Sequence, residues 1–159
     1  MERDQLSEVA FIEYSVSFAY NKKILEDLSI KRKKTGRKTI MLKFSCVSPQ
    51  GACCLYYGVS ARATQKPGEI RDCFAALVEE ICLLSRAMGA DLGPGMVDRN
   101  LTILDGVEPE MTTSLQRDIL RGGASELEGL ILDVPRLGAR YGVTLPTYEK
   151  IAAALRKKD

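Results

Sequence analysis

Two polar side chains in the last third of the sequence could face one small ligand. Ser114 and Glu126 each stand near the predicted start of a helix, within the segment TTSLQRDILRGGASELEG. A hydroxyl and a carboxylate there could hold polar groups of a substrate, and the helix dipole favours the ionised carboxylate. The alternative is that both residues only contribute to the two helix starts. The residues themselves leave both interpretations open.

The residues around this pair predict the helix boundaries. Thr113 with Gln116, and Ser125 with Glu128, have the spacing of a capping box. Gly122-Gly123 is expected to end the first helix, because glycine tolerates the positive φ of a helix C-terminus. The second helix has the three- and four-residue apolar spacing of an amphipathic helix, through Leu127, Leu130, Ile131, Val134 and Leu137.

Several other kinds of chemistry lack the residues they need. The chain contains no histidine, which excludes a Ser-His-Asp triad and a Cys-His nucleophile. No two cysteines have C-x-x-C spacing, so no zinc or other metal site is predicted. We interpret all five as structural thiols in a reducing compartment: Cys46, Cys53, Cys54, Cys73 and Cys82.

Composition and charge predict a cytoplasmic protein. The chain has 159 residues, 45% of them hydrophobic, which is enough for a real core. Its net charge of +2 gives no general attraction to nucleic acid. No apolar run is long enough to span a membrane, and the first thirty residues are too charged for a secretory signal.

From residue 40 onward, the patterns predict an all-helical array. An apolar stretch covers 39–57, interrupted by Pro49, and a long helix follows with Pro67 in its first turn and Gly89 at its end. A shorter helix is predicted at 96–104, and a last one after Pro146. The segment GPGMVD at 93–98 lacks the third glycine of a dinucleotide fingerprint and is predicted to be a helix-to-helix turn.

The first forty residues are predicted to be a separate N-terminal extension. Residues 12–20, IEYSVSFAY, alternate between apolar and polar positions, which indicates a strand. Residues 31–38, KRKKTGRK, are interpreted as a solvated basic linker loop. The alternative for this segment is contact with a polyanion.

Four short strings resemble motifs of a known family. They are SLQRD at 114–118, GGASEL at 122–127, RLG at 136–138 and GVTLP at 142–146. Together they are similar to the C-terminal domain of the ketopantoate reductases (2-dehydropantoate 2-reductases), over roughly residues 41–159. The resemblance implies a helical domain of the 6-phosphogluconate dehydrogenase C-terminal-like fold. Members reduce ketopantoate with NADPH, on the way to pantothenate and coenzyme A.

The resemblance also implies site residues. A serine and a glutamate at the positions of Ser114 and Glu126 face the bound keto acid. Lys43, followed by Phe44, matches the catalytic lysine that polarises or protonates the carbonyl oxygen. An ammonium group suits this role because the reaction creates an alkoxide. We therefore expect the Lys43 side chain to reach Glu126, directly or through one water.

Several positions depart from the family pattern. Met41 replaces a tryptophan, Val47 and Gly51 replace asparagines, and Ile131-Leu132 replaces an Asn-Gly pair. These substitutions leave the identity of the 2-keto acid open.

The family's NADPH-binding Rossmann domain has no counterpart in residues 1–40. We therefore expect this chain alone to bind no NADPH and to be no working reductase. Three explanations stay open: a split subunit with the nucleotide domain on a separate chain, a fragment of a longer gene, or a domain retained for another use. Two other functions remain open. One is a non-catalytic helical module that forms a homodimer, and the other is polyanion binding through residues 31–38.

Overall fold

The structure is all-α throughout its described part. The computed structural model describes residues 22–122 and 126–157, and for 22–36 only the backbone. Its elements are α2 (Lys22–Tyr57), α3 (Ala61–Gln65), α4 (Glu69–Ala87), α5 (Met96–Asp105), α6 (Ser114–Leu120), the π-helix η1 (Glu128–Leu132), α7 (Val134–Arg140) and α8 (Pro146–Arg156). No strand occurs among these residues, which confirms the predicted fold class. The strand predicted at 12–20 lies outside them.

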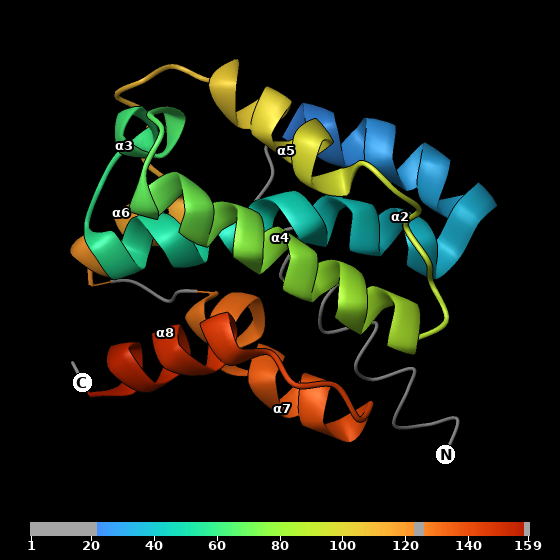
Figure 1. Cartoon of the computed structure of the whole chain (residues 1–159). Coiled ribbons are helices and arrows are strands. Elements are labelled where there is room, and N and C mark those ends of the chain that lie inside the picture. The colour runs from blue at the N-terminus through green and yellow to red at the C-terminus, as the bar shows by residue number, and fades with distance from the viewer. Residues whose placement is uncertain (1–21, 123–125, 158–159) are drawn as a thin grey trace.

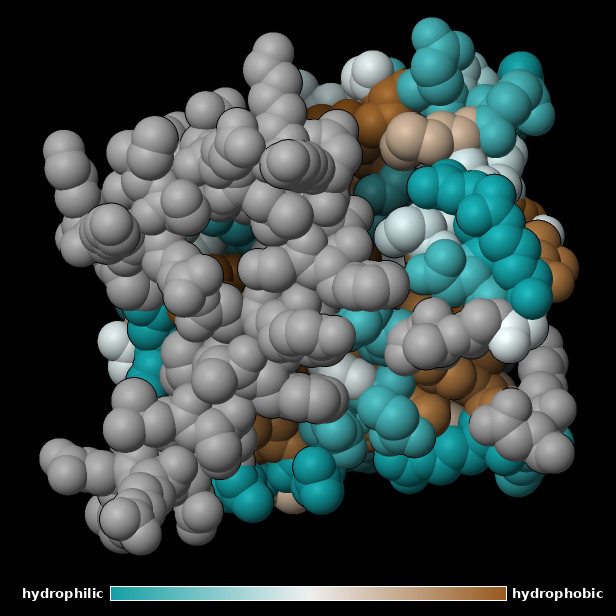
Figure 2. Space-filling view, turned by 180° about the vertical axis from the view of Figure 1, so that it is seen from behind, coloured by the Kyte–Doolittle hydropathy of each residue, from teal (hydrophilic) through white to brown (hydrophobic). Residues whose placement is uncertain are grey.

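Two long helices form the centre of the molecule. Helices α2 and α4 pack against each other, α5 packs on α4 from one side, and α8 contacts both from the other (Figure 1). The predicted apolar stripe of α4 is confirmed, because Phe74, Leu77, Ile81, Leu84 and Met88 are all buried. On the visible surface of the described part, polar residues alternate with smaller apolar areas (Figure 2).

Helix α2 is longer than the sequence predicted. Residues 31–38, expected to be a loop, are helical, so that expectation is wrong. Lysine and arginine are good helix formers, and an existing helix extends at low cost. The Arg37 guanidinium donates a hydrogen bond to the Met88 carbonyl, at 2.6 Å, beside the negative end of α4. Helix α2 crosses residue 40, and the division into two domains there stays a prediction.

Pro49 does not interrupt α2. A proline inside a helix leaves the carbonyl four residues earlier without its usual N–H partner, and here that carbonyl belongs to Ser45. The buried side-chain amide of Asn100, on α5, donates to the Ser45 carbonyl and to the Ser45 hydroxyl, at 3.2 Å each. A side chain from another helix thus replaces the bond that proline removes.

The remaining boundaries agree closely with the sequence. Helix α5 and the start of α8 at Pro146 are confirmed, and the 93–95 segment is a helix-to-helix turn with Gly93 and Gly95 at positive φ. Pro67 is an exception. Helix α4 begins at Glu69 with Gly68 as its N-cap, so Pro67 precedes the helix.

A buried carboxylate on α4 fixes the start of α8. Glu80 accepts hydrogen bonds from the backbone N–H of Thr147 at 2.7 Å and of Tyr148 at 3.0 Å, one on each oxygen. The first N–H groups of a helix have no partner inside it. The N-cap of α8, Leu145, provides no side-chain cap. Glu80 therefore caps α8 from a different helix.

We predict that Glu80→Gln lowers the free energy of unfolding by about 1–3 kcal/mol, because the amide NH₂ would face one of the two N–H groups and leave it unpaired. Urea denaturation measures the loss. The control is Glu79→Gln, an exposed neighbour on the same helix, which should change stability by less than about 0.5 kcal/mol. Equal effects of the two substitutions would contradict the capping role.

Candidate functional site

Two of the three predicted site residues lie on contacting helices, and the third lies just before an element that contacts the same helix α2. Lys43 is in α2, Ser114 is the first residue of α6, and Glu126 lies two residues before η1. Helix α2 packs against both α6 and η1. All three side chains are half-buried, and Lys43 and Glu126 each make at least one polar or electrostatic interaction. The contact between Lys43 and Glu126 stays a prediction.

The start of α6 confirms one predicted capping box. The Thr113 hydroxyl accepts from the Gln116 N–H at 3.2 Å, and the Gln116 side-chain oxygen accepts from the Thr113 N–H at 3.0 Å. The N-cap is therefore Thr113, and the Ser114 hydroxyl is not the capping group. The Gln116 amide also donates to the Val59 carbonyl at 3.0 Å, which fixes α6 against the end of α2. Gly122 follows α6 at positive φ, as predicted, while Gly123 and Ser125 lie outside the described residues.

The segment after Glu126 is a π-helix where the sequence predicted an α-helix. The Asp133 N–H donates to the Glu128 carbonyl at 2.8 Å, five residues back. Pro135 has no N–H to offer the Ile131 carbonyl, so a regular α-helix cannot continue through it unchanged. The predicted apolar face is nevertheless buried at Leu130, Ile131 and Val134. Short π-helices are frequent at functional sites.

Ser48 joins three elements at this π-helix. Its hydroxyl donates to the Leu130 carbonyl at 2.5 Å and lies 2.6 Å from the Tyr148 hydroxyl. Because the Ser48 proton is used by Leu130, the Tyr148 hydroxyl is the donor in the second bond. Burial raises the pKa of Tyr148, which keeps that donor protonated. Helices α2, η1 and α8 are thus held together beside Glu126.

Positions that depart from the family pattern are part of the core. Met41 and Ile131 are buried, and Val47 packs against the same core. A Cβ at Gly51 would lie 3.4 Å from the Leu115 side chain, so the larger asparagine would meet α6. Met41, Val47 and Ile131 are thus packed in the core, and Gly51 allows the close approach of α6.

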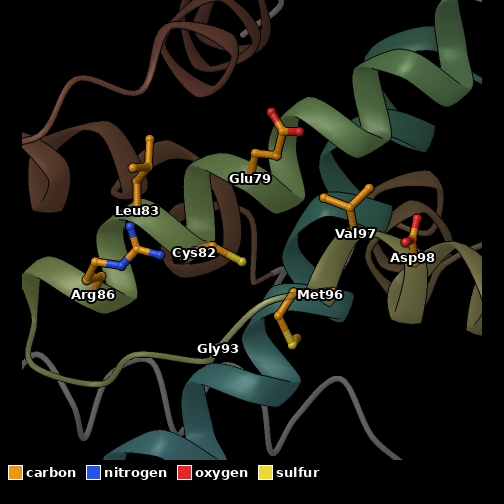
Figure 3. A pocket seen from close by; sticks show the side chains of 9 residues that line it. Glu79, Cys82, Leu83, Arg86, Gly93, Met96, Val97 and Asp98 are labelled. Carbon is orange, nitrogen blue, oxygen red and sulfur yellow. The ribbon is translucent and has the colours of Figure 1, made fainter.

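A separate surface hollow lies between α4 and the start of α5 (Figure 3). Its lining residues are Glu79, Cys82, Leu83, Arg86, Gly93, Gly95, Met96, Val97 and Asp98. Figure 3 shows the labelled side chains of the two helices on either side of it. None of the three predicted site residues lines this hollow.

A group of reactive side chains between α2 and α4 was missed by the sequence analysis. The Cys53 thiol donates to the Ile70 carbonyl at 3.3 Å, and the Tyr57 hydroxyl donates to Glu69 at the same distance. A hydrogen bond with the Cys53 thiol is the main cause that lowers the pKa of Cys73 to about 7. Cys53 and Tyr57 are one turn apart in α2, and Glu69 and Cys73 are one turn apart in α4. The sequence does not indicate that these two helix faces pack against each other.

The comparison with protein families gives one match. The family described as "Ketopantoate reductase PanE/ApbA C terminal" matches residues 36–159. The chain belongs to the ketopantoate reductase family. This confirms the resemblance stated above. A comparison with curated protein sequences finds no match.

Several solved structures share the fold of this chain. A dimeric ketopantoate reductase from Staphylococcus aureus is 23% identical, with a TM-score of 0.69 over 76% of this chain and 42% of that one. The 2-dehydropantoate 2-reductase from Methylococcus capsulatus is 20% identical, with a TM-score of 0.68 over 75% and 41%. D-mandelate dehydrogenase with NADH and anilino(oxo)acetate is 16% identical, with a TM-score of 0.67 over 79% and 41%.

These structural similarities show that the chain has the same fold as the matching part of those proteins. The chain spans about two fifths of the length of each of these solved proteins. None of the described helices in the ketopantoate reductase domain combines the length and apolar character needed to cross a membrane.

We predict that Ser48→Ala lowers the free energy of unfolding by about 2–4 kcal/mol, because the buried Leu130 carbonyl and Tyr148 hydroxyl would both lose a partner. Adding Tyr148→Phe removes one unpaired group, so the double variant should lose less than the sum of the two single variants. Chemical denaturation of all three measures the coupling, and strict additivity would contradict the network. Ser60→Ala is the control, because Ser60 makes no side-chain cap to α3.

Proposed function

We propose that this ketopantoate reductase-family domain binds a 2-keto acid through Lys43, Ser114 and Glu126. The observation that carries the proposal is the packing of α2 against both α6 and η1, because α2 carries Lys43, α6 begins at Ser114 and η1 begins two residues after Glu126. The half-buried state of all three side chains supports it. Lys43 stands among Met41, Leu42 and Phe44, and a lysine among apolar neighbours is costly to bury unless its ammonium reaches water or a carboxylate.

Each residue has a distinct proposed role. The Lys43 ammonium polarises or protonates the ketone oxygen, where negative charge develops as the ketone is reduced. Glu126 accepts a hydrogen bond from a substrate hydroxyl, and Ser114 contacts the same ligand. The capping of α6 by Thr113 supports this role, since it leaves the Ser114 hydroxyl available.

The hydride donor in the proposed reaction is NADPH, in the pathway to pantothenate and coenzyme A. The described residues do not fit this cofactor, because the one Gly-x-Gly turn joins two helices and contains Pro94. We propose that NADPH is bound by a Rossmann domain outside the described residues. The enzymatic activity is therefore that of the assembled reductase, with the domain described here supplying the substrate side, in the cytoplasm.

The first test measures keto-acid binding by calorimetry, with 2-dehydropantoate as the probe. We predict that Lys43→Met weakens binding about tenfold or more, which corresponds to the loss of one charge-assisted hydrogen bond. Lys38→Met is the matched control, because Lys38 is an exposed lysine on the same helix, and it should bind like the unmodified protein. Equal affinity of both variants would reject the catalytic assignment of Lys43.

A second test separates the two interpretations of Glu126. If Glu126 holds a substrate hydroxyl, Glu126→Gln should lower affinity while the melting temperature barely changes. If it only favours the helix dipole, stability should fall by a few tenths up to about 1 kcal/mol, with binding unaffected. Calorimetry and thermal unfolding on the same variant distinguish these outcomes.

The second candidate function is a non-catalytic helical module that forms a homodimer. The burial of Met41 and Ile131, with Val47 packed against the core, favours it, because the resemblance implies asparagines at the positions of Val47 and Ile131. The absence of keto-acid binding together with a concentration-dependent dimer in sedimentation would support this module. A polyanion-binding role for 31–38 would instead show steep salt dependence of nucleic-acid retention.

A further inference from the structure

We propose that Cys53 and Cys73 are a peroxide-sensitive thiol pair that closes reversibly into a disulfide between α2 and α4. This site is separate from the proposed keto-acid site, and its test does not depend on substrate binding.

The contacts between the two helices bring the thiols together. Cys53 is buried on α2, and its thiol donates to the Ile70 carbonyl at 3.3 Å. One turn later, Tyr57 donates to Glu69, also at 3.3 Å. This face of α2 therefore lies against the 69–70 turn of α4.

Helix geometry places Cys73 over the same turn. Residue 73 is three and four positions after Ile70 and Glu69, so it shares their face of α4. Side chains in an α-helix tilt toward its N-terminus, so the Cys73 thiol is directed back toward the Ile70 carbonyl. The Cys53 thiol lies 3.3 Å from the same carbonyl. The hydrogen bonds and the helix geometry thus place both thiols beside the Ile70 carbonyl, and from this we infer the pairing.

The surroundings of Cys73 favour its thiolate. The neighbouring Cys53 thiol is the main cause that lowers its pKa, and the Tyr57 hydroxyl and the charge of Lys150 on α8 act in the same direction. Burial and the negative charge of Glu80 oppose them, and the resulting pKa is about 7. Lys150 lies at this end of the interface, with its ammonium 5.7 Å from the centre of the Tyr56 ring.

The other cysteines are poorer nucleophiles. Burial raises the pKa of Cys54 to about 11, and burial also raises the pKa of Cys46 and of Cys82. The thiolate is the form of cysteine that reacts with peroxides. Near neutral pH, Cys73 is therefore the thiol that should react first, and Cys53 is its neighbour.

The chemistry requires only a hydroperoxide as oxidant. The Cys73 thiolate attacks one peroxide oxygen, the O–O bond breaks, and a sulfenic acid and hydroxide form. The hydroxide takes up the proton that the Cys73 thiol released on ionising and becomes water. The Cys53 sulfur then attacks the Cys73 sulfur, the S–O bond breaks, and the thiol proton leaves with the hydroxyl group as water. Two thiols are oxidised to one disulfide, and hydrogen peroxide is reduced to two waters. A dithiol reductant reverses the reaction by thiol–disulfide exchange.

The disulfide would join two functionally important helices. Helix α2 carries the proposed catalytic Lys43, and α4 carries Glu80, which caps α8. Their relative movement would be restricted in the oxidised protein.

The experiment treats the full chain with hydrogen peroxide and maps its thiols by peptide mass spectrometry. We expect one cross-linked peptide pair, Cys53 with Cys73, that disappears after reduction with a dithiol. In Cys73→Ser the cross-link should be absent. In Cys53→Ser, Cys73 should stop at the sulfenic acid, which dimedone traps. Cys82→Ser, a substitution of a half-buried cysteine on the same helix, is the matched control and should oxidise like the unmodified protein.

A second measurement on the unmodified protein needs no variant to fold. The alkylation rate of each cysteine by iodoacetamide is followed against pH. Cys73 should react with a midpoint near pH 7, and at that pH it should react about tenfold or more faster than Cys82. Uniform alkylation, or peroxide treatment that gives no Cys53–Cys73 link, would overturn the proposal.

Discussion

The two oxygens of Glu80 accept the first available N–H groups of α8, and through them the C-terminal helices are attached to α4. The donors are adjacent backbone groups, so both oxygens find partners only when α8 has one position and direction. The capped residue Tyr148 then reaches Ser48 on α2, and Ser48 reaches the Leu130 carbonyl in η1. These contacts connect α4, α8, α2 and η1 through buried hydrogen bonds. In a protein core, a polar group that loses its hydrogen-bond partner is costly.

Prolines inside helical segments explain two unusual features near the candidate site. Pro49 leaves the Ser45 carbonyl without a backbone partner, and the Asn100 side chain from α5 supplies one. Pro135 follows the π-helix, whose wider turn rearranges the backbone bonds before it. At Pro49 a side chain of another helix replaces the missing N–H and ties α2 to α5. At Pro135 the preceding backbone instead takes the wider path of a π-helix. Lys43 and Glu126 lie close in sequence to these two places.

In the proposed keto-acid site, residues that match the family motifs stand beside positions that depart from them. Three positions of the family motifs, Lys43, Ser114 and Glu126, are present, whereas Met41, Val47 and Ile131 make the surroundings more apolar. At Gly51 the absence of a side chain allows α6 to approach α2 through Leu115. An apolar, closely packed surrounding would strengthen the electrostatic effect of any ammonium or carboxylate that remains in it.

The sequence alone determined the all-α class, the long α4 stripe, the Thr113 capping box and the family, because these depend on local periodicity, capping chemistry and short motifs. It also supplied the three candidate residues. It did not reveal the helical state of 31–38, the continuation of α2 through Pro49 or the π-helix after Glu126. Besides local causes, each has a partner from a distant segment: Met88 for Arg37, Asn100 for Ser45, and Ser48 for Leu130. The Glu80 cap and the meeting of Cys53 with Cys73 were decided only by tertiary structure, because the rotation of one helix face against another is not encoded in the spacing of either helix by itself.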